Sequence, residues 1–188
     1  MSDVVSLRRE PLAGFVAPSG AAVVLAPLPP AARFVLCARP AAQDAATGPL
    51  GVALPAMACR AATAGSRAAL WLGPDEWLLL APEAEGTALA AALATALADL
   101  PHSLVDVGHR QAGLGVSGPE AIAVLNAGCP LDLDPEAFPI GMCTRTVLGK
   151  SQIVLWRTGA QSFRVEAWRS FLPYVWGFLA EAAREFSG

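Results

Sequence analysis

Charged residues are scarce in this chain of 188 residues. Only 15% of them are Asp, Glu, Lys or Arg, against about 25% in a typical soluble domain. The formal net charge is −3, and the 13 Lys and Arg residues are scattered, so the sequence lacks the basic patch of a nucleic-acid-binding surface. So little charge cannot solvate a complete monomer surface well, and the composition therefore favours a protein partner.

Cysteine, histidine and long apolar runs are also limited. The cysteines form no Cys-x-x-Cys, and with only two histidines they give no metal-ligand spacing. We therefore expect reduced thiols in a cytoplasmic protein that binds no metal. The sequence has no proline-free run of about 18 uncharged apolar residues, so we expect no membrane span. Arg8-Arg9 followed by an apolar stretch resembles an export signal, but prolines interrupt that stretch.

The chain is divided by composition into an arm and a domain. Residues 1–32 are rich in Pro, Ala and Gly and predict an extended arm, in which Val23-Val24-Leu25 adds an edge strand. Residues 33–188 predict a single α+β domain. Period-two and short apolar runs predict strands at 33–38, 69–72, 77–80, 103–107, 113–116, 152–157 and 162–166, with loops at 41–49 and 135–144.

Three helices are predicted from capping residues and helical apolar spacing. The first is capped by Thr87 and runs to about Leu100. The second is capped by Ser117 and ends at Gly128 in the left-handed conformation. The third is capped by Ser170 and runs to about Phe186. Two hairpins, at 69–80 and 152–166, carry Trp71 and Trp156 at matching points. This weak duplication predicts two intertwined α+β halves, each with a small, mostly antiparallel sheet backed by helices.

The predicted last helix is apolar on two faces. One face carries Phe171 and Tyr174, and the other carries Leu172 and Trp176. A helix of this kind is either buried inside its own domain or shared with a partner. Leu172 and Trp176 are therefore candidate interface residues, with burial as the alternative.

Polar and titratable residues gather between the predicted strands at 103–107 and 113–116. Asp106 could orient His109 or pair with Arg110 at the edge of a pocket. We favour a structural interpretation, in which a charged pair ties the loop. Residues 113–118 match the letters G-x-G-x-x-G, but the first two glycines fall inside a strand, which argues against a dinucleotide site. The residues themselves indicate no catalytic, cofactor-binding or metal-binding group.

Several blocks occur in a familiar order between Leu70 and Trp176: Leu70-Trp-Leu-Gly-Pro-Asp-Glu-Trp-Leu78, Asp106-Val-Gly-His-Arg110, Val116-Ser-Gly-Pro-Glu-Ala121, Gly128-Cys-Pro-Leu-Asp-Leu133, Phe138-Pro-Ile-Gly141 with Arg145-Thr146, and Arg169-Ser-Phe171 with Tyr174-Val-Trp176. Together they resemble the gamma subunit of heterotetrameric sarcosine oxidase. That family is similar to the folate-binding domain of the glycine-cleavage aminomethyltransferases.

The resemblance implies a role in sarcosine catabolism and one-carbon metabolism. In that family the complex oxidatively demethylates sarcosine to glycine, with H2O2 and formaldehyde or methylene-tetrahydrofolate as further products. FAD, FMN, NAD and tetrahydrofolate are expected on the other subunits and none on this chain. The alpha subunit is the expected direct partner, in a complex with beta and delta.

The resemblance also points to the loss of a reactive acid. Aminomethyltransferases carry an acidic residue just before the strand that corresponds to 153–157, where this chain has Ser151-Gln152. The leading hypothesis is therefore a non-catalytic structural subunit of the complex. The alternatives are a stand-alone folate-binding or one-carbon-transfer domain, and a homo-oligomeric scaffold.

Overall fold

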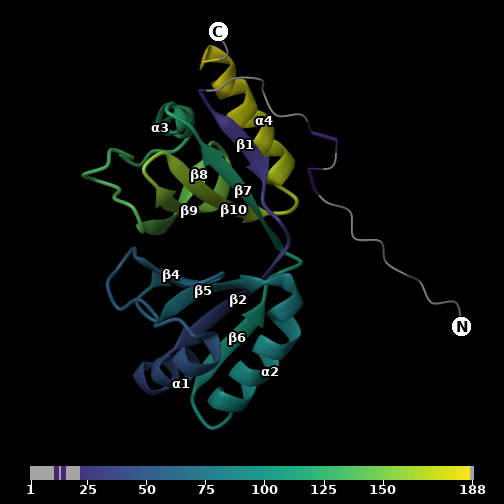
Figure 1. The fold of residues 1–188 in the computed structure, drawn as a ribbon, viewed down its shortest axis with the longest axis vertical. Coiled ribbons are helices and arrows are strands. Elements are labelled where there is room, and N and C mark those ends of the chain that lie inside the picture. Colours follow the sequence, from purple (N-terminus) through teal and green to yellow (C-terminus); the bar gives the residue numbers. More distant parts are fainter. Residues whose placement is uncertain (1–10, 13, 16–21, 187–188) are drawn as a thin grey trace, which may run out of the picture.

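The structure is a computed structural model that describes residues 11–12, 14–15 and 22–186. Within those residues the chain forms two five-stranded antiparallel sheets that lie face to face, with helices on the two outer sides (Figure 1). Most of the predicted N-terminal arm lies outside the described residues. No helix in the described part combines the length and apolarity needed to cross a membrane.

The first sheet belongs to the N-terminal half of the domain. Its strands, in spatial order, are β3 (Ala61–Ala64), β4 (Arg67–Gly73), β5 (Glu76–Pro82), β2 (Ala31–Ala38) and β6 (His102–Asp106). Helices α1 (Pro40–Leu50) and α2 (Gly86–Leu97) cover its outer face, and the short 3-10 helix η1 (Glu83–Glu85) leads into α2.

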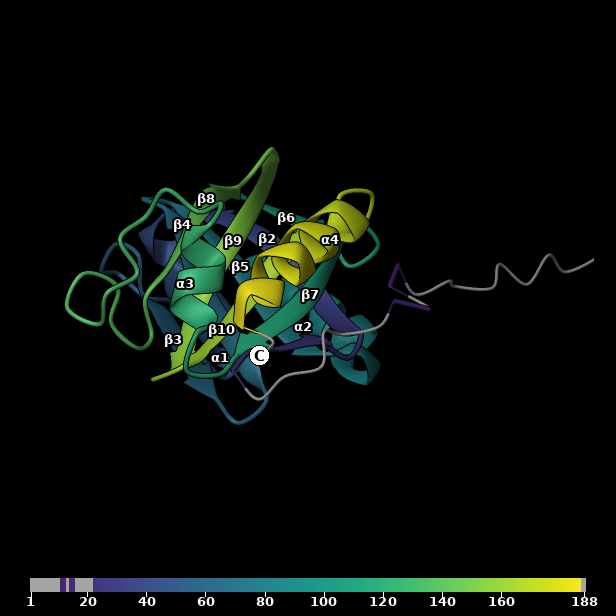
Figure 2. The same cartoon turned by 90° about the horizontal axis from the view of Figure 1, so that it is seen from above.

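The second sheet repeats this plan. Its strands, in spatial order, are β8 (Cys143–Leu148), β9 (Ser151–Gly159), β10 (Ser162–Trp168), β7 (Gln111–Ser117) and β1 (Val24–Pro27). Helices α3 (Ala121–Asn126) and α4 (Leu172–Ala183) lie over its outer face, and α4 continues into the 3-10 helix η2 (Arg184–Phe186) (Figure 2).

The two halves exchange one strand each. β1 precedes β2 in the chain but pairs with β7 of the second sheet, and β6 precedes β7 but pairs with β2 of the first sheet. Each sheet therefore takes its last strand from the segment that leads into the other sheet. This arrangement confirms the predicted duplicated, intertwined α+β fold, and β1 is the predicted edge strand.

Both faces of the central strands are buried. In β5, Trp77, Leu79 and Ala81 pack with the helices, whereas Leu78 and Leu80 join the cluster between the sheets. Successive side chains of a strand point to opposite faces, so a strand covered on both sides needs a continuous apolar run. That requirement explains the uninterrupted run of leucines at 78–80.

The predicted loop at 41–49 is wrong, because this segment is helix α1. Ala42, Ala46 and Leu50 repeat at helical spacing and are buried against the sheet. Gly48 and Pro49 argue against a helix in the sequence, but they lie in its last turn, where Pro49 removes only one internal hydrogen bond. Gly51, with φ at 70°, then ends the helix in the left-handed conformation.

The predicted caps are also wrong. Thr87 lies inside α2, Ser117 is the last residue of β7, and Ser170 lies two positions before α4. None of these helices has a side-chain hydrogen bond at its N-cap. Gly128 does not adopt a positive φ, because α3 ends at Asn126 with Ala127 as a right-handed C-cap. Packing and chain turns, rather than capping side chains, set these helix ends.

Gly128 is required for space. A Cβ atom at Gly128 would lie 2.5 Å from Cε1 of Phe178 in α4 and 3.0 Å from the backbone nitrogen of Gly149. We expect Gly128→Ala to lower the free energy of unfolding by about 1–3 kcal/mol, the usual cost of overpacking. Gly177→Ala in α4 is the matched control, because nothing lies within 4 Å of its added Cβ, and it should stabilise the chain by up to about 1 kcal/mol. Urea unfolding of both variants measures the difference, and equal effects would contradict this account.

Candidate functional site

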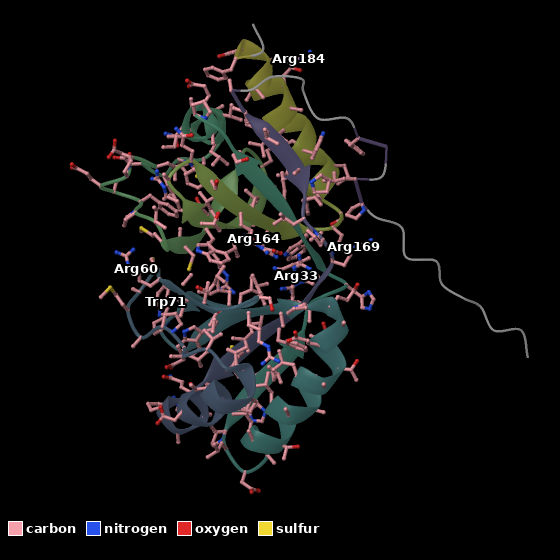
Figure 3. All side chains as sticks on the ribbon, in the orientation of Figure 1. Arg33, Arg60, Trp71, Arg164, Arg169 and Arg184 are labelled. Atoms are coloured by element: carbon pink, nitrogen blue, oxygen red, sulfur yellow. The ribbon has the colours of Figure 1, made fainter. Side chains whose placement is uncertain are left out.

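A buried cluster of charge joins the two halves. Nε of Arg33, in β2, donates to Oε2 of Glu166, in β10, at 2.6 Å, and Nη2 of Arg33 donates to Oε1 at 3.2 Å. Nε of Arg164 donates to the same Oε1 at 2.8 Å. The Arg33 and Glu166 side chains are 1% and 0% exposed. Figure 3 labels Arg33 and Arg164, which lie where the two sheets face one another.

The first glycine of the G-x-G-x-x-G letters, Gly113, makes room for this cluster. Gly113 in β7 pairs in register with Glu166. A Cβ atom at Gly113 would lie 2.9 Å from Oε1 of Glu166 and 3.3 Å from Nη2 of Arg33. Gly113 and Gly115 lie within β7, as predicted, and the close approach of the charged groups explains why Gly113 has no side chain.

A cleft of about 540 Å³ opens beside the charged cluster, between the sheets. The first sheet contributes Val35 and Leu72, and the second sheet with the loop before β7 contributes the rest of the lining. The polar members of that lining are Arg110, Gln111, Arg145, Thr146, Gln152 and Glu166, and Trp168 forms an aromatic part of the wall.

The charged groups of this cleft are largely satisfied within the chain. Both carboxylate oxygens of Glu166 accept hydrogen bonds from guanidinium groups. Arg145 forms a bidentate pair with Glu76 across the two sheets, with Nη1 at 2.6 Å from Oε2. The hydrogen bond from Arg145 holds the pKa of Glu76 below its usual value, and the pKa of Arg145 is raised in turn. Glu166 therefore anchors an ion cluster and offers no free oxygen for proton transfer to a ligand.

Gln111 is the exception in the cleft. Its side chain is 8% exposed, and its buried Oε1 has no hydrogen-bond partner among the described residues. A buried acceptor left unpaired costs about 1–3 kcal/mol.

The structure separates the predicted cluster of Asp106, His109 and Arg110. Oδ1 of Asp106 accepts a hydrogen bond from the backbone of Gly108 at 2.8 Å, a local turn. Asp106 and His109 line a second hollow of about 390 Å³ beside α2. Arg110 lines the main cleft, and its guanidinium lies 5.3 Å from the centre of the Trp168 ring. The expected pair between Asp106 and Arg110 is not among the ion pairs of the described residues, and a functional role for the three stays a prediction.

Leu172 and Trp176 are buried in the core of their own domain. Both belong to α4, are 1% and 3% exposed, and pack in the core of the second half. The ring of Phe15 meets the ring of Trp176 edge-on at 6.3 Å. Burial, the alternative to an interface, therefore accounts for both residues. The face that begins with Phe171 is divided: Phe171 and Tyr174 are exposed, whereas Val175 and Leu179 of the same predicted face are buried.

Trp168 was not predicted as part of any site. Phe163, Val165 and Ala167 of β10 alternate into the core, which places Trp168 on the cleft side of the sheet. This alternation is the signal that identifies it. Gln111 had no comparable signal, since a glutamine at a strand end is ordinarily solvated.

Burial of Cys143 between the sheets makes the free energy of unfolding depend on pH. Its thiol is fully buried and lies 3.6 Å from the carbonyl oxygen of Trp71, and burial raises its pKa to about 12. An unfolded thiol ionises near pH 8.5, so above that pH the unfolded chain gains stability relative to the folded chain. Between pH 8 and pH 10, Cys143 should therefore remove about 2 kcal/mol from the free energy of unfolding.

The variant Cys143→Ala should lose correspondingly less stability than the wild type over the same pH range. Urea unfolding at both pH values measures the difference. Parallel losses in the two proteins would contradict the buried, protonated thiol.

Removal of one member of the charged cluster should be costly. Glu166→Ala leaves buried guanidinium groups without a counter-charge, and we expect a loss of about 3–5 kcal/mol in the free energy of unfolding. The matched control is Glu181→Ala, which removes an exposed pair with Arg184 and should cost less than about 0.5 kcal/mol. Chemical denaturation compares the two, and a loss below about 1 kcal/mol for Glu166→Ala would show that the cluster does not hold the halves together.

Comparisons with known proteins agree with this geometry over nearly the whole chain. Residues 36–185 match the family described as "Sarcosine oxidase, gamma subunit family". The chain is 38% identical to the sarcosine oxidase subunit gamma of Arthrobacter sp over 98% of its own length and 94% of the relative. It is 42% identical to that of Corynebacterium sp. (strain P-1) over 64% of its own length and 58% of the relative.

Solved structures extend the likeness to the fold. A chain of the heterotetrameric sarcosine oxidase from Corynebacterium sp. U-96, solved in complex with pyrrole 2-carboxylate, superposes with a TM-score of 0.89 at 35% identity, covering 97% of both chains. The glycine cleavage system aminomethyltransferase T from Bartonella henselae superposes with a TM-score of 0.67 at 14% identity, over 88% of this chain and 47% of that one; this second match concerns the fold alone. On its sequence, its duplicated sheets and its match to the gamma-subunit profile, the chain belongs to the sarcosine oxidase gamma subunit family.

Proposed function

We propose that the chain is a structural subunit of a heterotetrameric sarcosine oxidase in the cytoplasm, where it packs against the alpha subunit and carries no catalytic group of its own. The observation that carries this proposal is the match over 97% of both chains with a component of the Corynebacterium complex. A likeness that covers nearly all of both chains supports the same place in an assembly.

The chemistry of the cleft supports a role without catalysis. Gln152 lines the cleft at the point where aminomethyltransferases would carry an acid. Ser151 beside it is buried, and its hydroxyl donates to the carbonyl oxygen of Gln152. Neither side chain is a proton acceptor near neutral pH. The oxidation of sarcosine and the binding of FAD, FMN, NAD and tetrahydrofolate are accordingly assigned to the other subunits.

The second candidate is a folate-binding or one-carbon-transfer domain that acts alone. The cleft of about 540 Å³ favours it, since small-molecule sites commonly measure 300–1,000 Å³. Against it stands the carboxylate of Glu166, whose two oxygens are already occupied by arginines. Calorimetric titration of the isolated chain with tetrahydrofolate separates the two candidates: micromolar binding would favour this second function.

Co-expression tests the proposed function directly. The chain, expressed with tagged alpha subunit and with beta and delta, should co-purify in stoichiometric amount, because its low charge and exposed aromatic side chains require a protein cover. The isolated chain should neither consume sarcosine nor release peroxide. Turnover by the isolated chain, or an alpha–beta–delta assembly that never recruits it, would contradict the proposal.

A further inference from the structure

Three exposed aromatic side chains mark one end of the second half. Trp168, Phe171 and Tyr174 are 41%, 45% and 39% exposed. The rings of Trp168 and Phe171 meet edge-on at 6.3 Å, and the hydroxyl of Tyr174 accepts a hydrogen bond from the backbone of Lys150 at 3.0 Å. These contacts hold the rings in place although water surrounds much of their surface. We call these three residues the aromatic ridge.

The aromatic ridge continues into the cleft. Trp168 belongs to both, and Val147 of the cleft wall is itself 39% exposed. A small molecule would fill the cleft but leave Phe171 and Tyr174 in water. Large aromatic side chains grouped at a surface are typical of protein interfaces, where they supply much of the binding energy. The shape of the combined surface therefore fits a protein segment better than a small ligand.

The polar groups of the cleft indicate the chemistry of that segment. The buried Oε1 of Gln111 lacks a donor among the described residues. The guanidinium of Arg110 stacks on Trp168, and no carboxylate of the described chain pairs with it. Glu166, Arg33, Arg145 and Glu76, by contrast, are already paired. The cleft thus holds one buried acceptor without an N–H donor and one exposed guanidinium without a carboxylate partner among the described residues.

We propose that a segment of a companion subunit inserts into this cleft, donates an N–H group to Oε1 of Gln111, places a carboxylate beside Arg110 and covers the aromatic ridge with apolar side chains. This proposal rests on the proposed function, and it identifies the surface and the partner chemistry. The occupant is an acidic loop or terminus with apolar flanks, since the unpaired charge of the cleft is positive. The cost of leaving Gln111 unpaired in the isolated chain is then offset on assembly.

Dissociation of the four-subunit complex on dilution, followed by native mass spectrometry, tests the aromatic ridge. Phe171→Ser and the double variant Trp168→Ser/Phe171→Ser should weaken retention of this chain at least about 30-fold, as expected for loss of a central aromatic contact. The matched control is Val105→Ser in β6, which removes an apolar side chain that is 50% exposed on the other sheet and should change retention less than about twofold.

Gln111→Met provides a readout that a purely structural role would not give. The substitution removes an unpaired buried acceptor at similar volume, so the isolated chain should become more stable to urea. The same variant should be released from the complex at least about fivefold more readily, because its partner loses an acceptor. Greater stability with unchanged retention would overturn the assignment of the cleft.

The outcomes separate this inference from the function on which it rests. If the wild-type chain joins the complex and the aromatic-ridge variants are retained as well as Val105→Ser, the docking surface is overturned and the proposed function stands. If the wild-type chain does not join the other subunits at all, the proposed function itself falls. Circular dichroism of each variant checks the fold, which Phe171→Ser, at the most exposed position of the ridge, should retain.

Discussion

The buried ion cluster of Arg33, Arg164 and Glu166 sets the relation between the two sheets. Charge removed from water is costly unless it is paired and fully hydrogen-bonded, and here each carboxylate oxygen meets a guanidinium. The geometry is satisfied only when β2 and β10 face one another in one register. Nonpolar side chains of similar volume would pack as tightly but would permit other offsets between the sheets. The cluster therefore specifies how the two halves meet.

The layer between the sheets combines two kinds of contact. An apolar part is formed mainly by side chains of β4, β5 and β9, with Cys143 among them. The polar part, around Glu166, opens into the cleft. The apolar part stabilises the contact between the sheets by burial, which does not fix their relative orientation. The hydrogen bonds of the polar part fix that orientation.

Local sequence patterns predicted most of the strands and the duplication, but they missed β3 and β8. Apolar runs located the hairpins of β4 with β5 and of β9 with β10, and the matching positions of Trp71 and Trp156 predicted the repeat. The same reasoning missed α1, because Gly48 and Pro49 lie in its last turn, and it assigned capping roles to Thr87, Ser117 and Ser170 that packing made unnecessary. The sequence of α4 did not settle its orientation, since two apolar faces on one helix do not reveal which side chains the sheet covers.

The site was harder to predict from the sequence than the fold. Arg33 and Glu166 are 133 positions apart, and nothing near either residue indicates its partner. The acceptor of Gln111 lacks a partner because the fold buries it, and the sequence of a polar residue at the start of a strand does not indicate such burial. Asp106 and Arg110 are close in the chain, but their neighbours in space differ, because the loop places them at two different hollows.

The exchange of strands has a consequence for how the chain is made. The first sheet contains no residue beyond Asp106, so it is complete once β6 has left the ribosome. The second sheet needs β1, which is synthesised first and then waits for β7. Contacts between such distant segments form slowly, and an unpaired strand is open to wrong partners. β1 therefore cannot pair until β7 has been made, so it joins its sheet only after the first sheet can be complete.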